Sequence, residues 1–524
     1  MLEFILNDQD IATDLPSGTT VLDFVRYHKD LKGTKIGCRE GDCGACTILV
    51  GELIDDNVRY RTMTSCLMPL ANAAGKHIVT IEGINPADGS LTPVQQAMVD
   101  ENGTQCGFCT VGFVMSLTGF CLTERGRPRP LPQHEGIPGS CENVDPVKAA
   151  ISSIDGNICR CTGYKSIERA ACKLSGQWSV DGGQSHAISN LHRAIEFKNV
   201  PSYFSTIPIR MRAIADDHRP LTTDHRPLHL VGGGTDLYVQ RPDQMAESES
   251  TPLFYDEHIR GIRDTGEYIE IGASATVTDL LESPVMNATF PNLYNYLKLV
   301  SSTPIRNMAT LGGNFVNASP IGDMTVWFLA LDAEITLSSP PYKGGVAAAS
   351  ADGVVLSQRA LKLKDLYLGY KQIAKQPDEI ITTIRFKKPT GDFRFNFEKV
   401  CKRTYLDIAT VNTAISISCS PTYEGGVAAA SADGVVLSDA HVAAGGVAPI
   451  PLYLKETSEF LRGKTVSEET IAAANEIMQS EISPISDVRG TEQYKRLLLR
   501  QLFRAHFVEI FTTEITEITE NRPR

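Results

Sequence analysis

Ten of the 13 cysteines in this 524-residue chain lie between Cys38 and Cys161. A secreted chain held together by disulfides is usually short and spreads its cysteines along its length. Cysteines concentrated in about a third of a long chain indicate metal or redox chemistry in a reducing compartment instead. The N-terminal third is therefore where the sequence predicts such a site.

Length and composition exclude several other classes of protein. With 524 residues, 42% hydrophobic and 21% charged, the chain is expected to form three or four globular domains and not a disordered, collagen-like or coiled-coil protein. We expect no signal peptide and no membrane span, because the N-terminus MLEFILNDQD is acidic and no run of 18 apolar residues occurs. A net charge of -12 without a Lys/Arg-rich run argues against nucleic acid as a partner.

The first set of cysteines is Cys38, Cys43, Cys46 and Cys66, spaced C-x4-C-x2-C-x19-C. This is the plant-type [2Fe–2S] spacing, in which a glycine-rich loop wraps the cluster and a distant fourth thiolate completes it. A zinc site and a redox-active Cys43–Cys46 pair are the alternatives. Zinc sites usually show two matched C-x2-C pairs, and a thioredoxin-like pair would precede a helix rather than a strand, so the spacing favours the cluster.

The second set is Cys106 and Cys109 in QCGFC, with Cys159 and Cys161 in ICRC. We expect Cys109 to begin a helix and Cys161 to lie just before another, so that the helix dipoles lower the pKa of both thiols. Structural zinc is the alternative on spacing alone, but a second cluster is favoured because electron carriers are useful in series. The remaining cysteines are expected to be inert thiols: Cys121, Cys141, Cys172, Cys401 and Cys419.

Hydrophobic periodicity outlines the elements around these cysteines. Strands of a small mixed sheet are expected at 2–7, 47–54 and 76–84, and helices at 93–101, 110–122, 146–154 and 166–174. Residues 124–146 and 175–186 are predicted to be a loop and a linker. Short strands and helices then alternate, until strands at 393–401 and 409–419 and helices at 466–480 and 491–510 suggest an α+β unit.

Two glycine turns follow in the part that is poor in cysteine. LVGGGTDL (230–237) follows a strand but is not a Rossmann fingerprint, because Leu237 stands where the third glycine would be, and no P-loop is present. IRNMATLGGNFVNASPIGD (305–323) contains the second turn. Each turn alone is as consistent with a plain loop as with a phosphate-binding turn. Together they could present N–H groups to a pyrophosphate.

The segments GCREGDCGACT, QCGFCTVGFVMSL and GNICRCTGY, in this order, resemble the iron–sulfur half of the xanthine dehydrogenase family. Val111 stands where relatives usually carry Pro, and the loop at 124–146 reads as an insertion; neither touches a ligand. The two glycine turns, with RTYLDIAT and AAGGVAPIP further on, resemble the FAD domain of the same family. The resemblance covers nearly the whole chain.

The resemblance implies a multidomain α+β fold. A β-grasp, ferredoxin-like [2Fe–2S] domain is expected at 1–86 and an all-α [2Fe–2S] domain at 87–175. After a linker at 176–190, an α+β FAD-binding domain of the vanillyl-alcohol-oxidase/PCMH type is expected at 191–394, and a C-terminal α+β domain of the FAD unit at 395–524.

The resemblance also implies site residues, none of them catalytic. The eight cysteines named above would bind the two clusters. The pyrophosphate side of FAD would be held by Val231, Gly232, Gly233, Gly234, Thr235 and Asp236. Contacts to the pyrophosphate and to the ribose or adenine portion would come from Thr310, Gly313, Asn314 and Asp323. Ile381 and Lys399 would lie near the flavin ring.

For function, the resemblance implies the small subunit of a two-subunit xanthine dehydrogenase in the cytoplasm. Such a subunit carries electrons through two [2Fe–2S] clusters and FAD to NAD+, while hypoxanthine and xanthine are oxidised to urate at a molybdopterin centre. That centre would belong to a large partner subunit, in a heterotetramer with two copies of each. An equivalent subunit acting with an aldehyde or another N-heterocycle is the alternative within the family, and a zinc-stabilised scaffold is the alternative outside it.

One further feature is a duplication. GGVAAASADGVVLS occurs identically at 344–357 and 425–438. Two copies do not make a repeat architecture, which needs at least three stacked units. We expect a surface hairpin in each copy, with turns at Asp352-Gly353 and Asp433-Gly434.

Overall fold

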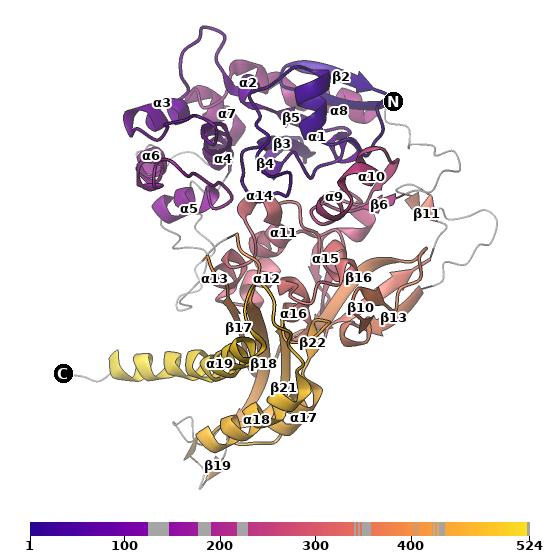
Figure 1. Ribbon diagram of the computed structural model, residues 1–524, viewed down its shortest axis with the longest axis vertical. Coiled ribbons are helices and arrows are strands. Elements are labelled where there is room, and N and C mark those ends of the chain that lie inside the picture. Colours follow the sequence, from indigo (N-terminus) through magenta and orange to yellow (C-terminus); the bar gives the residue numbers. More distant parts are fainter. Residues whose placement is uncertain are drawn as a thin grey trace. The chain divides into compact units, whose positions relative to one another are not determined.

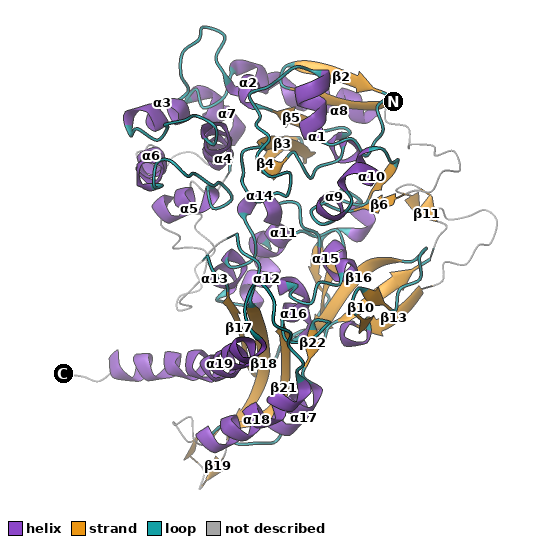
Figure 2. Ribbon diagram, viewed as in Figure 1, coloured by secondary structure: helices purple, strands orange, loops and turns teal. Residues whose placement is uncertain are grey.

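The computed structural model describes residues 1–123, 146–176, 190–216, 229–339, 342–343, 346–347, 358–403, 406–421, 423–424, 427–428 and 435–520. Most of the expected loop at 124–146 and linker at 176–190, including Cys141, lies outside these ranges. The chain divides into two compact units. The first comprises residues 1–256, 276–279 and 301–310, and the second the remaining residues. The chain is thus a multidomain α+β protein (Figures 1 and 2).

The first unit begins with a five-stranded mixed sheet in the order β2-β1-β5-β3-β4. Its strands are β1 (Leu2–Leu6), β2 (Gln9–Thr13), β3 (Thr47–Ile54), β4 (Asn57–Thr64) and β5 (His77–Val79). β1 pairs in parallel with β5 and antiparallel with β2. The Thr20 side chain caps α1 (Val21–Asp23), and a second short helix, α2, covers Ile81–Ile84. The expected ferredoxin-like sheet is therefore present.

A helical part follows. It contains α3 (Pro93–Asp100), α4 (Thr110–Leu122), α5 (Pro146–Ser153), α6 (Lys165–Gly176), α7 (Asn190–Glu196) and α8 (Ile207–Asp216). Thr92 and Gln95 form a capping box that fixes the start of α3. α4 is buried from Gly112 to Leu122, as its apolar sequence predicts.

The first unit also contains the segment with the first glycine turn. Its elements are β6 (His229–Val231), α9 (Leu237–Gln240), α10 (Pro242–Ala246), β7 (Ser250–Pro252) and α14 (Thr303–Arg306). β6 and β7 pair in parallel. Val231, Tyr238 and Met245 share one hydrophobic core with the N-terminal sheet. The ferredoxin-like sheet and this segment are therefore packed as one body.

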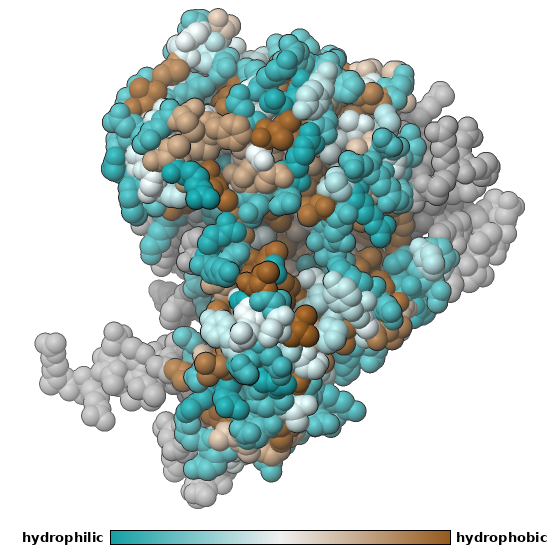
Figure 3. Space-filling model, viewed as in Figure 1, coloured by the Kyte–Doolittle hydropathy of each residue, from teal (hydrophilic) through white to brown (hydrophobic). Residues whose placement is uncertain are grey.

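The second unit contains two sheets. One has the order β13-β10-β16-β9-β8 and the other β17-β18-β21-β22. Their strands are β8 (Ile262–Asp264), β9 (Tyr268–Gly272), β10 (Glu334–Ser338), β13 (Gln358–Lys362), β16 (Ile380–Lys387), β17 (Asp392–Val400), β18 (Val411–Pro421), β21 (Val435–Gly445) and β22 (Leu452–Tyr453). A small two-stranded sheet joins β14 (Tyr367–Gly369) and β15 (Gln372–Ile373). In Figure 3 the visible surface is mostly hydrophilic, while the aliphatic and aromatic side chains of both units lie mainly in their cores.

Helices accompany the sheets of the second unit. They are α12 (Pro284–Thr289), α13 (Leu293–Lys298), α15 (Leu311–Asn317), α16 (Asp323–Leu329), α17 (Lys455–Leu461), α18 (Glu468–Glu481) and α19 (Glu492–Glu520). α11 (Val277–Glu282) begins in the first unit and ends in the second. α18 and α19 lie where the sequence predicts the two late helices. In the described part of the chain no helix is long and apolar enough to span a membrane.

Each copy of the duplicated sequence begins at a short antiparallel hairpin. β11 (Tyr342–Lys343) pairs with β12 (Val346–Ala347), and β19 (Tyr423–Glu424) pairs with β20 (Val427–Ala428). The strands flank 344–345 and 425–426, while the expected Asp-Gly turns lie outside the described residues.

For the end of the second copy, the prediction of a surface hairpin is wrong. Residues 435–438 begin β21, where Val436 pairs with Ser420 on β18 and Leu437 is fully buried. β18 thus offers a partner strand to the end of the second copy, and residues 348–357 of the first copy lie outside the described residues.

Candidate redox centres and flavin-binding loops

The first four cysteines converge from a loop and a strand end. Cys38, Cys43 and Cys46 precede β3, and Cys66 follows its hairpin partner β4, in which Thr64 pairs with Thr47. The loop folds tightly, since a Cβ on Gly37 would lie 2.5 Å from the Cys43 Sγ. Such a close approach explains why a glycine stands at position 37, where no side chain would fit beside Cys43.

The four thiols interact in two pairs. Hydrogen bonds from the Cys43 thiol and from backbone N–H groups lower the pKa of Cys38 to about 5. The hydrogen bond with Cys38 raises the pKa of Cys43. The N–H groups of Glu40 and Asp42 donate to the Cys38 Sγ at 3.3 and 3.4 Å. In the second pair, hydrogen bonding with Cys66 lowers the pKa of the buried Cys46, and the same contact raises the pKa of Cys66. The site thus favours thiolates over thiols at one member of each pair.

The second four cysteines also form two pairs. The Cys161 Sγ lies 3.6 Å from the Cys106 Sγ, and Cys109 and Cys159 hydrogen bond to each other. Cys109 caps α4, as expected. The prediction that helix dipoles lower the pKa of Cys109 and Cys161 is wrong. Burial raises the pKa of Cys109 to about 12, and the hydrogen bond with Cys106 raises the pKa of Cys161.

The arrangement of the cysteines can be compared with what a zinc ion and a [2Fe–2S] cluster require. A structural zinc ion needs four ligands around one centre, whereas a [2Fe–2S] cluster is held by four cysteines on two irons. Among the described residues no group of three or more His, Cys, Asp or Glu side chains could hold a single ion. Each set supplies four cysteines, which is the number of ligands that a [2Fe–2S] cluster takes.

The two cysteine loops are joined directly. The N–H of Ile158, next to Cys159, donates to the Cys43 carbonyl at 3.0 Å, and the Asn157 Nδ2 donates to the Gly44 carbonyl at 3.1 Å. Asn157 is fixed in turn by the Ser116 hydroxyl on α4 at 2.8 Å. The helical part thus holds its second cysteine hairpin against the first cysteine loop.

The turn at 231–236 has the features of an anion site. None of the described residues accepts a hydrogen bond from the N–H groups of Gly232, Gly233, Gly234 or Thr235. Gly234 has φ +81°, which bends the loop, and Asp236 directly precedes α9. Successive free N–H groups in such a turn can bind a phosphate. The loop therefore fits the pyrophosphate of FAD, as the resemblance implies.

The glycines of this turn are explained by packing as well. A Cβ on Gly232 would lie 2.7 Å from the Thr310 Oγ1, and one on Gly233 would lie 1.8 Å from the Met308 carbonyl oxygen. The segment 301–310 thus supports the first turn, and Thr310 lies beside this turn. Gly313, Asn314, Asp323, Ile381 and Lys399 belong to the second unit.

The first cysteine loop also touches the two flavin segments of its own unit. A Cβ on Gly41 would lie 2.8 Å from the Ile305 Cδ1, and a Cβ on Gly234 would lie 2.4 Å from the carbonyl oxygen of Leu67, the neighbour of Cys66. The first cysteine set is thus in contact with the helical hairpin on one side and with the glycine turn on the other.

A buried ion pair ties the segment 301–310 to the helical part. The Arg306 Nη2 lies 2.6 Å from the Asp155 Oδ2, and both side chains are 2% exposed. The N–H of Thr303 donates to the Asp155 Oδ1 at 2.7 Å. The sequence shows no local sign of this pair, because its members are 151 residues apart.

In the second unit, Asp323 and Lys399 form a buried pair on one rung of a sheet. Lys399, Asn412 and Gly445 lie side by side on β17, β18 and β21. Asp323 begins α16 and accepts from the Lys399 Nζ at 2.7 Å and from the Asn412 Nδ2 at 2.6 Å. A Cβ on Gly445 would lie 2.2 Å from the Asn412 Oδ1. Ile381 is buried on β16, in the other sheet.

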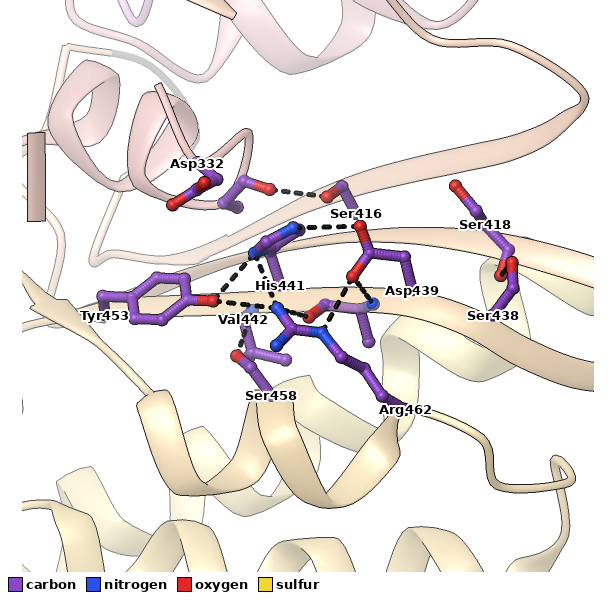
Figure 4. Close-up of polar contacts among 12 residues, drawn as sticks. Asp332, Ser416, Ser418, Ser438, Asp439, His441, Val442, Tyr453, Ser458 and Arg462 are labelled. Carbon is purple, nitrogen blue, oxygen red and sulfur yellow. Dashed lines mark hydrogen bonds and ion pairs between the residues drawn. The ribbon is translucent and has the colours of Figure 1, made fainter. Parts of the chain in front are cut away.

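A polar network elsewhere in this unit connects β21 with α17 (Figure 4). The His441 Nδ1 lies 2.7 Å from the Tyr453 hydroxyl, and the Arg462 Nε donates to the Asp439 Oδ1 at 2.8 Å. Hydrogen bonding with His441 and Arg462 lowers the pKa of Asp439. The polar groups of this network form hydrogen bonds with one another, so we assign the network a structural role.

Profiles of four protein families match the chain. They are "2Fe-2S iron-sulfur cluster binding domain" at 4–71, "[2Fe-2S] binding domain" at 80–172, "FAD binding domain in molybdopterin dehydrogenase" at 210–388 and "CO dehydrogenase flavoprotein C-terminal domain" at 397–510. These matches and the paired thiols define a chain with two [2Fe–2S] domains and an FAD-binding domain. This set of domains fits an iron–sulfur and FAD subunit of the molybdenum hydroxylase family.

Individual relatives include xanthine dehydrogenases. Xanthine dehydrogenase 1 of Arabidopsis thaliana is 27% identical over 96% of this chain and 39% of its own length. Xanthine dehydrogenase of Blastobotrys adeninivorans is 26% identical over 96% of this chain and 40% of its own length. The chain thus spans about two fifths of the curated relatives it matches. Among solved structures, a chain of a Cu,Mo-CO dehydrogenase is 26% identical with a TM-score of 0.46, over 55% of this chain and 90% of that one.

Proposed function

We propose that this chain is the iron–sulfur and FAD subunit of a xanthine dehydrogenase, and that it links a molybdenum centre on a partner chain to NAD+. Bound [2Fe–2S] clusters and FAD supply one-electron and two-electron redox chemistry, and the protein supplies their placement. The xanthine dehydrogenases among the relatives support the choice of substrate. The expected cytoplasmic location is part of the same proposal.

The observation that carries the proposal is the serial contact within the first unit. Ile158, beside Cys159, hydrogen bonds to Cys43, and Leu67, beside Cys66, contacts Gly234. The helical cysteine set, the ferredoxin-like set and the glycine turn therefore follow one another through direct contacts. Such an order suits electron transfer from a partner on the helical side to FAD.

The residues of this chain would divide the work as follows. Each cysteine set would hold one cluster through its two thiol pairs. The free N–H groups of 232–235 would bind the pyrophosphate, and Thr310 supports that loop. In the second unit, Gly313, Asn314 and Asp323 would contact the bound FAD, and Ile381 and Lys399 would lie near its flavin ring.

The helical cysteine set offers a place for the partner. Cys106 and Cys161 are exposed, and so are Phe108 (46%) and Tyr164 (36%) beside them. Exposed aromatic side chains next to a redox centre suit docking of the large molybdopterin subunit, which would place the two centres close together. A heterotetramer with two copies of each subunit is part of this proposal.

Metal and cofactor analysis of the purified chain tests the first half of the proposal. We expect about four irons with acid-labile sulfide and about one FAD per chain. Zinc in place of iron would overturn it in favour of a scaffold. Co-purification from the source organism tests the second half: the partner should carry molybdopterin, and the complex should reduce NAD+ with xanthine. Activity with an aldehyde or another N-heterocycle, and none with xanthine, would contradict the assigned substrate.

A further inference from the structure

The glycine turn at 231–236 is built largely on the ferredoxin-like sheet. The hydroxyl of Tyr238, just after the turn, donates to the Gly18 carbonyl at 2.7 Å, and Tyr238 is buried in the core of that sheet. The N–H of Ser250 on β7 donates to the Ser17 Oγ at 2.7 Å. The strand pair that carries the turn is thus anchored to the N-terminal segment at two points.

One side chain of the sheet domain reaches the turn itself. Asn72 lies in the short helix Leu70–Ala73 and is 1% exposed. Its Nδ2 donates to the Gly232 carbonyl at 3.0 Å, across 160 residues of sequence. Since the carbonyl of a peptide fixes the plane of the next N–H, this bond orients the N–H of Gly233.

Asn72 also carries an unsatisfied group. Its Oδ1 is buried and has no hydrogen-bond partner among the described residues. A buried amide oxygen without a partner is costly, so such a residue is retained where its other hydrogen bond matters or where a bound molecule supplies a donor. Both explanations connect Asn72 with the glycine turn at 231–236.

We propose that Asn72, a residue of the ferredoxin-like domain, is a positioning residue for FAD. It holds the turn through the Gly232 carbonyl so that the free N–H groups of 232–235 converge on the pyrophosphate. This inference rests on the proposed function. It adds that the iron–sulfur domain is a structural part of the flavin site.

The test is FAD binding by the complete chain after removal of the flavin, followed by flavin fluorescence quenching. We expect Asn72→Ala to weaken FAD binding about tenfold, which corresponds to about 1.4 kcal/mol, with iron content unchanged. Asn72→Asp should weaken it more, because it replaces the donor by a negative charge that faces a carbonyl and lies near the pyrophosphate site.

Asn199→Ala is the matched control, because Asn199 is also buried (2%) with an unpaired Oδ1 and has no part in the turn. It should keep FAD affinity at the wild-type value. Equal FAD affinity in the wild type and both Asn72 variants would overturn the inference while leaving the proposed function intact. A wild-type chain without FAD would instead overturn the proposed function.

Hydrogen exchange of the wild-type chain decides the matter if the Asn72 variants lose their clusters. Adding FAD should slow amide exchange both in 232–235 and in the helix at 70–73, because the two are linked through Asn72. Slower exchange in 232–235 alone would contradict the role of Asn72.

Discussion

Two buried histidines show how individual residues set the conditions in which the chain is stable. His77 and His506 are fully buried, and burial lowers the pKa of each to about 3. His506 accepts from the Asn396 Nδ2 at 3.0 Å, which fits a neutral ring. In an unfolded chain these groups take up a proton near pH 6.5.

The first prediction concerns pH. Between pH 6.5 and 3 the unfolded chain binds protons that the native chain does not, so the native state loses stability as the pH falls. The slope is up to about 1.4 kcal/mol per pH unit for each histidine. Urea unfolding at pH 7.5, 6.5 and 5.5 measures it. His506→Gln should reduce the slope, and Gln at the exposed His258 should leave it unchanged. An unaltered slope in the His506 variant would refute the prediction.

The second prediction concerns the Arg306–Asp155 pair. Arg306→Met leaves a buried carboxylate without its cation and should cost about 3–5 kcal/mol of stability. The double variant Arg306→Met with Asp155→Leu should recover much of that loss, because no unpaired charge remains. Thermal unfolding of the wild type and the variants measures both effects. A double variant less stable than Arg306→Met would show that the broken ion pair is not the cause of the lost stability.

At the scale of elements, the second copy of the duplicated sequence shows what a neighbouring strand contributes to a short segment. Both copies start at a hairpin of two-residue strands, and the second copy ends in β21 of a four-stranded sheet. The pairing of β21 with β18 supplies the hydrogen bonds for residues 435–438, and the core below supplies burial for Leu437.

The third prediction concerns deletion of each copy of the duplicated sequence. Deleting 344–357 should leave FAD and iron content unchanged, because β11 and β12 pair only with each other among the described strands. Deleting 425–438 should destabilise the second unit and lower its FAD content, because it removes the start of β21. Deleting only 425–434, which keeps Leu437, is the matched control and should behave as the first deletion does. Loss of FAD from the first deletion would contradict this reading.

At the scale of the whole molecule, local patterns predicted more than long-range contacts. The cysteine spacings placed both thiol sets, and the period of apolar residues placed α3, α4, α18 and α19, because these signals lie within a few residues of each other. The pairing of thiols, the Asn72–Gly232 bond and the Arg306–Asp155 pair join residues far apart, and no spacing in the sequence encodes them. The dipole argument failed because it left out the burial of Cys109 and the hydrogen bond between Cys161 and Cys106.

The fourth prediction separates the ends of the proposed electron path. Cys109→Ser removes one thiol of the helical set and should abolish electron transfer from xanthine to NAD+ in the complex. Transfer from NADH to an artificial dye should largely survive, because the ferredoxin-like set and the flavin loop are untouched. Both assays are run on one preparation with its iron and FAD measured. Equal loss of both activities with FAD retained would refute the order of the centres.

The core shared by the N-terminal sheet and the segment around Tyr238 also limits how such chains can be recombined. A chimera that takes its iron–sulfur domains from one relative and its flavin domain from another would be joined most simply in 177–189. That junction divides one core between two parents, and at the identity of about 27% seen here few of the packed side chains would match. Exchange of whole domains should therefore fail unless residues 229–256 and 301–310 travel with the iron–sulfur domains.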